Sequence, residues 1–295
     1  MKPLQSQQAE FFVPDGRPIE AALARTTHLA VGAHQDDLEI MAIDGILQCF
    51  QRNDRWFTGI VVTDGAGSPR AGVYANYSDD DMRRVRVQEQ KKAAQLGEYG
   101  ALALLGYSSA VVKAEGESGP TQDLRTLLEV ARPETVYLHN LADKHPTHVA
   151  VALRAIAALR ALPREARPQR VYGCEVWRSL DWMLDGDKIV FDTSPWENLQ
   201  LALLGVFDSQ ISGGKRYDLA AMARRRANAT YFESHGVDTA SAMAYGMDLT
   251  PLIEDPARDI RGYVLDFIQR FADDVGMALT KATPTGRGAG GPDGV

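Results

Sequence analysis

The chain has little cysteine and no long apolar run. Cys49 and Cys174 are its only cysteines among 295 residues, which excludes a disulfide framework and is typical of a reducing compartment. No segment approaches the roughly 20 consecutive apolar residues of a membrane span; the most apolar one, 149–162, contains Arg154 and Arg160 and favours an amphipathic core helix. The N-terminus, MKPLQSQQAEFF, lacks the apolar region of a secretory signal. We therefore expect a soluble, cytoplasmic protein.

The chain also lacks an excess of basic residues over acidic ones. Lys and Arg number 32 against 39 Asp and Glu, for a formal net charge of −7. Proteins that coat nucleic acid need a basic face to displace counterions, so nucleic acid is not an expected partner. The hydrophobic content of 45% is that of a globular chain, and this length allows a large core without disulfides.

Apolar, β-branched segments alternate with helical patterns, as in βαβ units. Strands are predicted at 27–33, 57–63, 101–107, 134–140, 171–177 and 187–192, and helices at 40–52, 81–97, 121–131, from Pro146 onward, and at 195–205, 215–234 and 253–276. The pattern predicts an α/β fold: a Rossmann-like, mainly parallel sheet flanked by helices. We expect one domain over 1–281, with its core at about 25–195, a helical C-terminal elaboration at about 195–281, and a disordered tail at 282–295, which is rich in Gly and Pro.

Two loops that follow predicted strands carry metal-binding side-chain types. The loop after the first strand contains His34 and, three positions later, Asp37; the loop after the fourth contains His145 and His148. Ligands of open parallel sheets bind beyond the carboxyl ends of the strands. If these two strands are neighbours, the loops meet, and two histidines with an aspartate and one open position have the ligand types of a catalytic zinc site.

Helix capping explains either loop taken alone. Asp36 or Asp37 can cap the helix that follows, and Pro146 suits a first helical turn with Asp143 or His145 near the cap. The occurrence of both loops after strands of one parallel sheet favours the metal hypothesis.

The motifs resemble, in order, those of the LmbE-like or PIG-L deacetylases, zinc hydrolases that remove N-acetyl groups from amino sugars and sugar conjugates. The resemblance covers roughly 27–160. It is carried by AHQDDLE at 33–39, Thr63-Asp64-Gly65, the helix with Arg86, Glu89, Ala93, Ala94, Leu96 and Gly97, LGY at 105–107, and Asp143 with His145-Pro146-Thr147-His148.

This resemblance implies one Zn²⁺ per chain, held by His34, Asp37 and His148. Asp36 would be the general base that takes a proton from the metal-activated water. His145, if protonated, would stabilise the oxyanion and deliver a proton to the leaving amine. The chain departs from the family at two positions: Gln35 replaces a proline, and Thr147 replaces an aspartate that many members have.

The resemblance also gives Arg86 a role in substrate binding, with an ion pair to Glu89 as the structural alternative. Asp143 and Asp64 are expected to support the metal ligands from behind, with a helix cap as the alternative for Asp64. His28 and His139 are expected to be structural, His235 to be a surface residue, and Arg224, Arg225 and Arg226 to form a solvated helix face.

The function we expect is hydrolysis of an N-acetylated, sugar-like small molecule, with release of acetate. One alternative is a Rossmann-like nucleotide or cofactor enzyme; the first loop lacks a Gly-x-Gly-x-x-Gly phosphate cradle, although DGAGSPRAG at 64–72 could cradle phosphate. Another is a metal-containing sugar-binding module without turnover. The sequence leaves the oligomeric state open, a homo-oligomer included.

Overall fold

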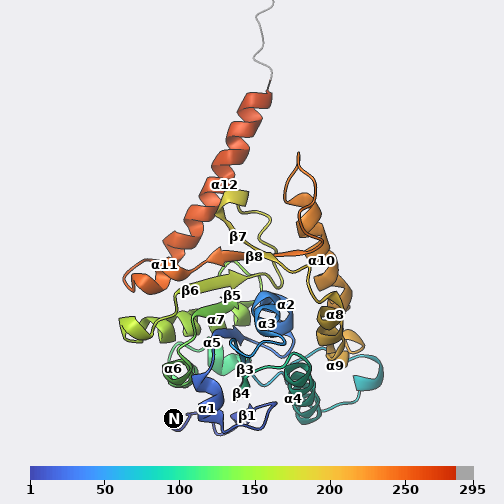
Figure 1. The fold of residues 1–295 in the computed structure, drawn as a ribbon, viewed down its shortest axis with the longest axis vertical. Helices are drawn as coiled ribbons and strands as arrows, with labels where there is room; N and C mark the ends of the chain where they lie inside the picture. Colours follow the sequence, from blue (N-terminus) through green and yellow to red (C-terminus); the bar gives the residue numbers. More distant parts are fainter. Residues whose placement is uncertain (284–295) are drawn as a thin grey trace, which may run out of the picture.

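The computed structural model describes residues 1–283, and the tail predicted at 282–295 lies almost wholly outside them. An eight-stranded sheet crosses the body in the order β1-β4-β3-β2-β5-β6-β8-β7 (Figure 1). Its strands are β1 Glu10–Phe12, β2 His28–Gly32, β3 Phe57–Thr63, β4 Ala101–Tyr107, β5 Thr135–His139, β6 Arg170–Cys174, β7 Lys188–Asp192 and β8 Met243–Asp248. The strands β4-β3-β2-β5-β6 run parallel, which confirms the predicted mainly parallel α/β fold.

Helices cover both faces of the sheet. One core contains apolar side chains of α1, Ile19–Ala24, α5, Ser109–Lys113, α6, Gly119–Ala131, and α7, Pro146–Arg160. The other contains those of α2, Asp37–Met41, α3, Ile43–Cys49, α4, Asp79–Leu96, and α8, Glu197–Gly205. The C-terminal region adds α9, Asp208–Ile211, α10, Tyr217–Tyr231, α11, Thr250–Glu254, and α12, Ile260–Ala282.

The chain reverses its direction across the sheet next to β2. From β2 it proceeds through β3 to β4 on one side, and it then returns to place β5 on the other side. Ligands of such sheets bind at this switch point, beyond the carboxyl ends of the strands. The expected pairing of the first and fourth predicted strands is confirmed, since His28, Leu29 and Ala30 of β2 pair with Thr135, Val136 and Tyr137 of β5. The loops 33–39 and 139–148 therefore leave the same edge.

The short helices α1, α5 and α9 were not predicted, and the structure departs from the predicted elements in three further places. β1 and β8 are additional strands, and β8 pairs antiparallel with both β6 and β7. The helix predicted at 40–52 is split at Ala42 into α2 and α3. The helix predicted at 253–276 is instead α11 and α12, because Pro256 follows Asp255 and keeps that residue extended, at φ −112° and ψ 95°.

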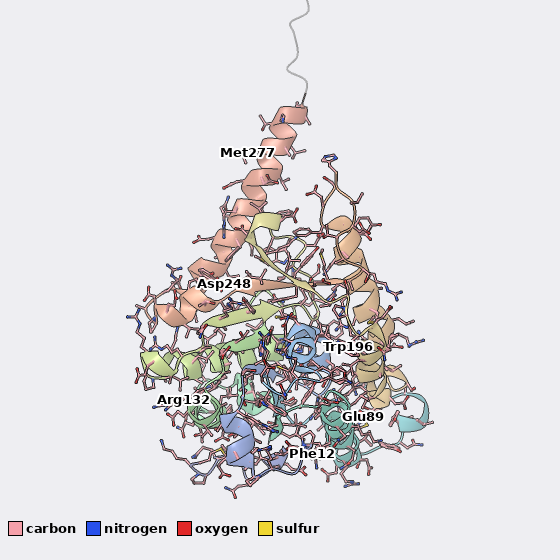
Figure 2. All side chains as sticks on the ribbon, in the orientation of Figure 1. Phe12, Glu89, Arg132, Trp196, Asp248 and Met277 are labelled. Atoms are coloured by element: carbon pink, nitrogen blue, oxygen red, sulfur yellow. The ribbon has the colours of Figure 1, made fainter. Side chains whose placement is uncertain are left out.

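The outer part of α12 extends away from the sheet, and Met277 marks it in Figure 2. Met277 is 65% exposed and Leu279 is 64% exposed. No helix in the described part of the chain is long and apolar enough to cross a membrane.

Candidate metal and active site

The loop after β2 has an unusual backbone at Asp36. Its φ of 99° lies in the left-handed region, which non-glycine residues seldom adopt. The Asp36 amide donates to Oε1 of Gln90 at 3.2 Å, and the Asp37 carboxylate accepts the His34 amide hydrogen at 2.7 Å. These two bonds hold adjacent carboxylates in different directions.

The loop after β5 is fixed by one carboxylate. Asp143 accepts the amide hydrogens of His145 at 2.8 Å and Trp177 at 3.1 Å. Pro146 then begins α7, where its missing N–H costs no helical hydrogen bond. His145 and His148 are thereby held at the start of α7, facing the first loop.

The two loops converge on three potential ligands. His34 Nδ1 lies 3.2 Å from His148 Nε2 and 3.3 Å from Asp37 Oδ2. His148 Nε2 lies 3.5 Å from Asp37 Oδ1. Bonds of about 2.0–2.1 Å from a tetrahedral zinc would separate neighbouring ligand atoms by about 3.3–3.4 Å. The chemistry and the spacing of these donors both fit a metal ion.

Two other histidines adjoin these three residues. Two overlapping triads have one ligand atom per residue, all within 4.8 Å of one another: His34, His145 and His148, and Asp37, His139 and His148. The Nε2 of His139 accepts the Ala33 amide hydrogen at 2.9 Å, so its lone pair is already used. The His139 ring is fully buried and stacks on His148, with centroids 3.9 Å apart. Its geometry is that of a packing partner for His148.

A buried carboxylate lies behind His148. Oδ2 of Asp143 is 3.7 Å from His148 Nδ1, on the opposite side of the ring from Nε2. Burial alone would lower the pKa of His148, but the carboxylates of Asp37 and Asp143 raise it. Carboxylates in this position orient metal-binding imidazoles in many proteins.

The neighbouring carboxylates have opposite pKa shifts. Burial raises the pKa of Asp36 well above its ordinary value, although the Arg86 guanidinium opposes the shift. Burial also acts to raise the pKa of Asp37, but His148 and His139 hold it well below the usual range. Asp37 is therefore ionised, as a carboxylate must be to bind a metal, and Asp36 is the better proton acceptor.

Arg86 supports Asp36 and does not pair with Glu89. Its guanidinium donates to the Gln35 carbonyl and lies 3.5 Å from the Asp36 carboxylate. Glu89, labelled on α4 in Figure 2, accepts instead from the amide and hydroxyl of Ser209, at 2.7 and 2.6 Å. Arg86 also lines the cavity over the cluster, so a substrate group can reach it.

His145 lies at the edge of the cluster. Its ring centroid is 5.0 Å from that of His34 and 4.5 Å from that of His148. Burial and these two imidazoles lower the pKa of His145 to about 4. The neutral imidazole is thus its resting form at pH 7, whereas the role implied by the resemblance holds only for a protonated ring. Within residues 1–283 its Nδ1 has no hydrogen-bond partner.

Residues 29–172 match the family model described as "PIG-L: GlcNAc-PI de-N-acetylase". This segment, 144 of the chain's 295 residues, is similar to the PIG-L (LmbE-like) family. All the ligand candidates lie inside the matched range. No curated protein matches the chain.

Solved structures share the PIG-L-like fold. The conserved protein TT1542 from Thermus thermophilus is 20% identical, with a TM-score of 0.56 over 79% of this chain and 99% of that one. GalB, the 4-carboxy-2-hydroxymuconate hydratase from Pseudomonas putida, is 16% identical, with a TM-score of 0.59 over 76% and 96%. The N,N'-diacetylchitobiose deacetylase from Pyrococcus horikoshii is 16% identical, with a TM-score of 0.56 over 75% and 83%. At identities this low, the structural similarity establishes a common fold and no more.

The cluster of histidines and aspartates lies in a cavity of about 520 Å³. The lining of this cavity includes His34, Asp36, Asp37, His145, Thr147 and His148. Asp64 also lines it, but this carboxylate bonds to Nε of Arg83 at 3.0 Å and to the amide of Ala66 at 3.1 Å. Within the described residues it has no hydrogen bond or ion pair to a proposed ligand, so it belongs to the cavity wall.

Gln35 compensates for the missing proline. Its side chain is 1% exposed and donates to the Thr63 carbonyl at 3.2 Å, which ties the loop to the end of β3. Gly65 makes room for it: φ there is +72°, and a Cβ would lie 2.4 Å from Gln35 Oε1. A side-chain contact thus restrains this loop at the position where the resemblance implies a proline ring.

A buried polar network that was not predicted from the sequence lies behind Asp36. Gln90, whose Oε1 holds the Asp36 amide, donates through Nε2 to Glu39 at 2.7 Å, and Tyr99 donates to the same carboxylate at 2.6 Å. Burial raises the pKa of Glu39 to about 7 in spite of these bonds. The spacing of Glu39 from Asp36 is visible in the sequence, but its partners come from α4 and from the turn before β4.

The expectation for Arg225 is wrong. This residue is 3% exposed and donates to the carbonyls of Glu39 and Ile40, at 2.8 and 3.2 Å. These carbonyls would otherwise accept hydrogen bonds in a continuing helix, which gives a physical reason for the break at Ala42. Arg225 therefore fixes the end of α2 from α10, and it is not part of a solvated face.

Replacing Gln90 with leucine is expected to lower the free energy of unfolding by about 1–3 kcal/mol, because the substitution leaves the Asp36 amide without its partner and the buried Glu39 carboxylate with the hydroxyl of Tyr99 but not the Gln90 amide. Thermal and denaturant unfolding measure the change. Gln95→Leu, on an exposed position of the same helix, is the matched control. Equal stabilities for the two variants would contradict a role for Gln90 in holding the loop.

Proposed function

We propose that the protein is a zinc-dependent N-deacetylase that hydrolyses the acetamide of an amino sugar or sugar conjugate and releases acetate and a free amine. The observation that carries the proposal is the convergence of three side chains: His34 Nδ1 and His148 Nε2 lie 3.2 Å apart, and each lies within 3.5 Å of one oxygen of the Asp37 carboxylate. The description of the matched family, de-N-acetylase, supports this reaction. So does the likeness to a diacetylchitobiose deacetylase.

The three residues would hold the ion through Nδ1 of His34, the carboxylate of Asp37 and Nε2 of His148. A zinc ion with one open position supplies Lewis acidity and makes a neutral water nucleophilic near pH 7. Asp143 would keep His148 in the orientation that presents Nε2. His139 would support the same ring from its face.

The remaining groups move protons. The oxygen of water attacks the amide carbon, and Asp36 accepts the proton that this water loses. The C–N bond then breaks, and a proton passes to the nitrogen to give the amine. His145 lies where a neutral imidazole can donate a hydrogen bond to the oxyanion or relay that proton. Arg86 keeps Asp36 in place through its guanidinium.

The fold does not by itself choose the reaction, since a hydratase shares it. Acetate release from a panel of N-acetylated amino sugars and conjugates, measured with the zinc-loaded protein, tests the proposal. We expect release from at least one member of the panel, its loss on chelation, and its recovery with added zinc. Turnover that survives complete removal of metal would overturn it.

A further inference from the structure

Two lysines line the cavity that contains the proposed reaction site. Lys113 ends the short helix α5, and Lys215 lies in the turn between α9 and α10. Both side chains line the cavity that contains the histidine cluster. They come from segments about a hundred residues apart, so the cationic character of the cavity does not arise from one stretch of chain.

Neither lysine is neutralised by the protein. The carboxylates of the cavity already face other groups, in the pairs Asp36–Arg86, Asp37–His148 and Asp64–Arg83. Within residues 1–283 no carboxylate lies within the 4.0 Å of an ion pair from either ammonium. Unpaired cations in a cleft attract ligands of opposite charge, here in a protein whose net charge is −7.

Lys215 is held beside an aromatic plane. Its Nζ lies 4.5 Å from the ring centroid of Trp177, and its backbone amide donates to the Gln210 carbonyl at 2.8 Å. Tyr217 meets Trp177 edge-on, with centroids 5.9 Å apart. A flat apolar surface next to an ammonium suits a sugar ring that carries an acidic substituent, because each part of that ligand finds a matching group.

A second cavity of about 330 Å³ adjoins the first and shares Ile40, Val176, Trp177, Lys215 and Tyr217 with it. Two arginines line this extension, but Arg216 is paired with Asp218 and Arg224 donates to the Val176 carbonyl. Lys215 therefore lies at the junction of the two cavities with its charge available. The two cavities together have room for a ligand that is larger than one sugar ring and extends beyond Lys215.

We propose that Lys113 and Lys215 form an anion subsite, which selects substrates that carry a phosphate or carboxylate group in addition to the acetamide. The proposal rests on the proposed function for the reacting bond, but the subsite itself can be tested by binding. It makes the substrate an acidic sugar conjugate and not a neutral one. Lys113 and Lys215 are its specificity-determining residues.

The kinetic test compares kcat/KM of the zinc-loaded protein for N-acetylglucosamine, its 6-phosphate and N-acetylmuramic acid, whose acidic group is a carboxylate. We expect at least one acidic substrate to exceed the neutral one by about tenfold or more. The Lys113→Ala/Lys215→Ala double variant should lose that preference and keep its rate on the neutral sugar within about threefold. The preference of the wild type should shrink at high salt, because ions screen it.

Lys144→Ala is the matched control. Lys144 Nζ approaches the same Trp177 ring, at 5.7 Å, but it does not line the reaction cavity, so its removal should leave the preference unchanged. A wild type with no preference for either acidic substrate would overturn the subsite, and so would a double variant that loses activity equally on neutral and acidic substrates.

A binding measurement separates failure of the subsite from failure of the proposed reaction. If no amide is hydrolysed, the proposed function fails, and calorimetric titration with inorganic phosphate and with N-acetylglucosamine 6-phosphate still judges the subsite. We expect the wild type to bind the sugar phosphate about tenfold more tightly than the double variant does. Equal affinities would overturn the subsite, and binding of inorganic phosphate alone would identify a free-anion site in place of a substrate subsite.

Discussion

Replacing His148 with alanine is expected to remove both the bound zinc and the hydrolytic activity. The substitution deletes one of three proposed ligands and removes the imidazole that helps to hold the pKa of the Asp37 carboxylate well below the usual range. Loss of the metal should lower kcat/KM by roughly a thousandfold or more, since it removes the activation of water. Zinc content by mass spectrometry and acetate release measure the two effects together.

The control for this variant is His235→Ala. His235 is exposed, as expected from the sequence, and lies outside the residues that line the cavity. It should retain one zinc per chain and full activity, and circular dichroism should show that both variants are folded. Stoichiometric zinc in folded His148→Ala would exclude His148 from the ligand set.

Replacing Asp36 with asparagine should have a different outcome, with zinc retained and turnover lost. Asparagine has nearly the same shape and tolerates positive φ better than most residues, so the loop should keep its conformation. It cannot accept a proton from water, and loss of a general base costs about 100- to 10,000-fold in rate. Acetate release under saturating substrate, beside zinc content, gives the measurement.

Asp37→Asn is the informative partner of this variant. The neighbouring substitution should reduce zinc affinity, because it replaces the ionised ligand with a neutral one. The two variants thus separate a base from a ligand by different readouts at adjacent positions. Loss of zinc in Asp36→Asn together with its retention in Asp37→Asn would show that the two carboxylates have exchanged roles.

The part of the fold that carries the site could be predicted from the sequence. β2 and β5 are fully buried along their length, so their apolar runs stand out, and the loops after them contain the histidines. The strands β1 and β8 could not be recognised in the same way. β8 contains a central glycine, Gly246, and pairs antiparallel between β6 and β7, and nothing local in its sequence fixes that distant pairing.

The proposed metal-binding and catalytic residues were easier to predict than the residues that hold them in place. His34, Asp37, His145 and His148 occur in two short motifs, and their convergence follows from the order of two strands. Gln90 and Arg225 act through contacts with residues 51 or more positions away, and each lies in a helix whose sequence is typical of a polar surface. Their burial depends on which neighbouring helix covers them, which helical periodicity does not determine.

The most direct test of the account is a crystal structure of the zinc-loaded protein with anomalous diffraction measured at the zinc edge. We predict one strong peak per chain, at about 2.0–2.2 Å from His34 Nδ1, an oxygen of Asp37 and His148 Nε2, with Asp36 next to the open position and not bound to the ion. A fully loaded protein with no peak between these three residues would contradict the central claim, as would a peak held through Asp36.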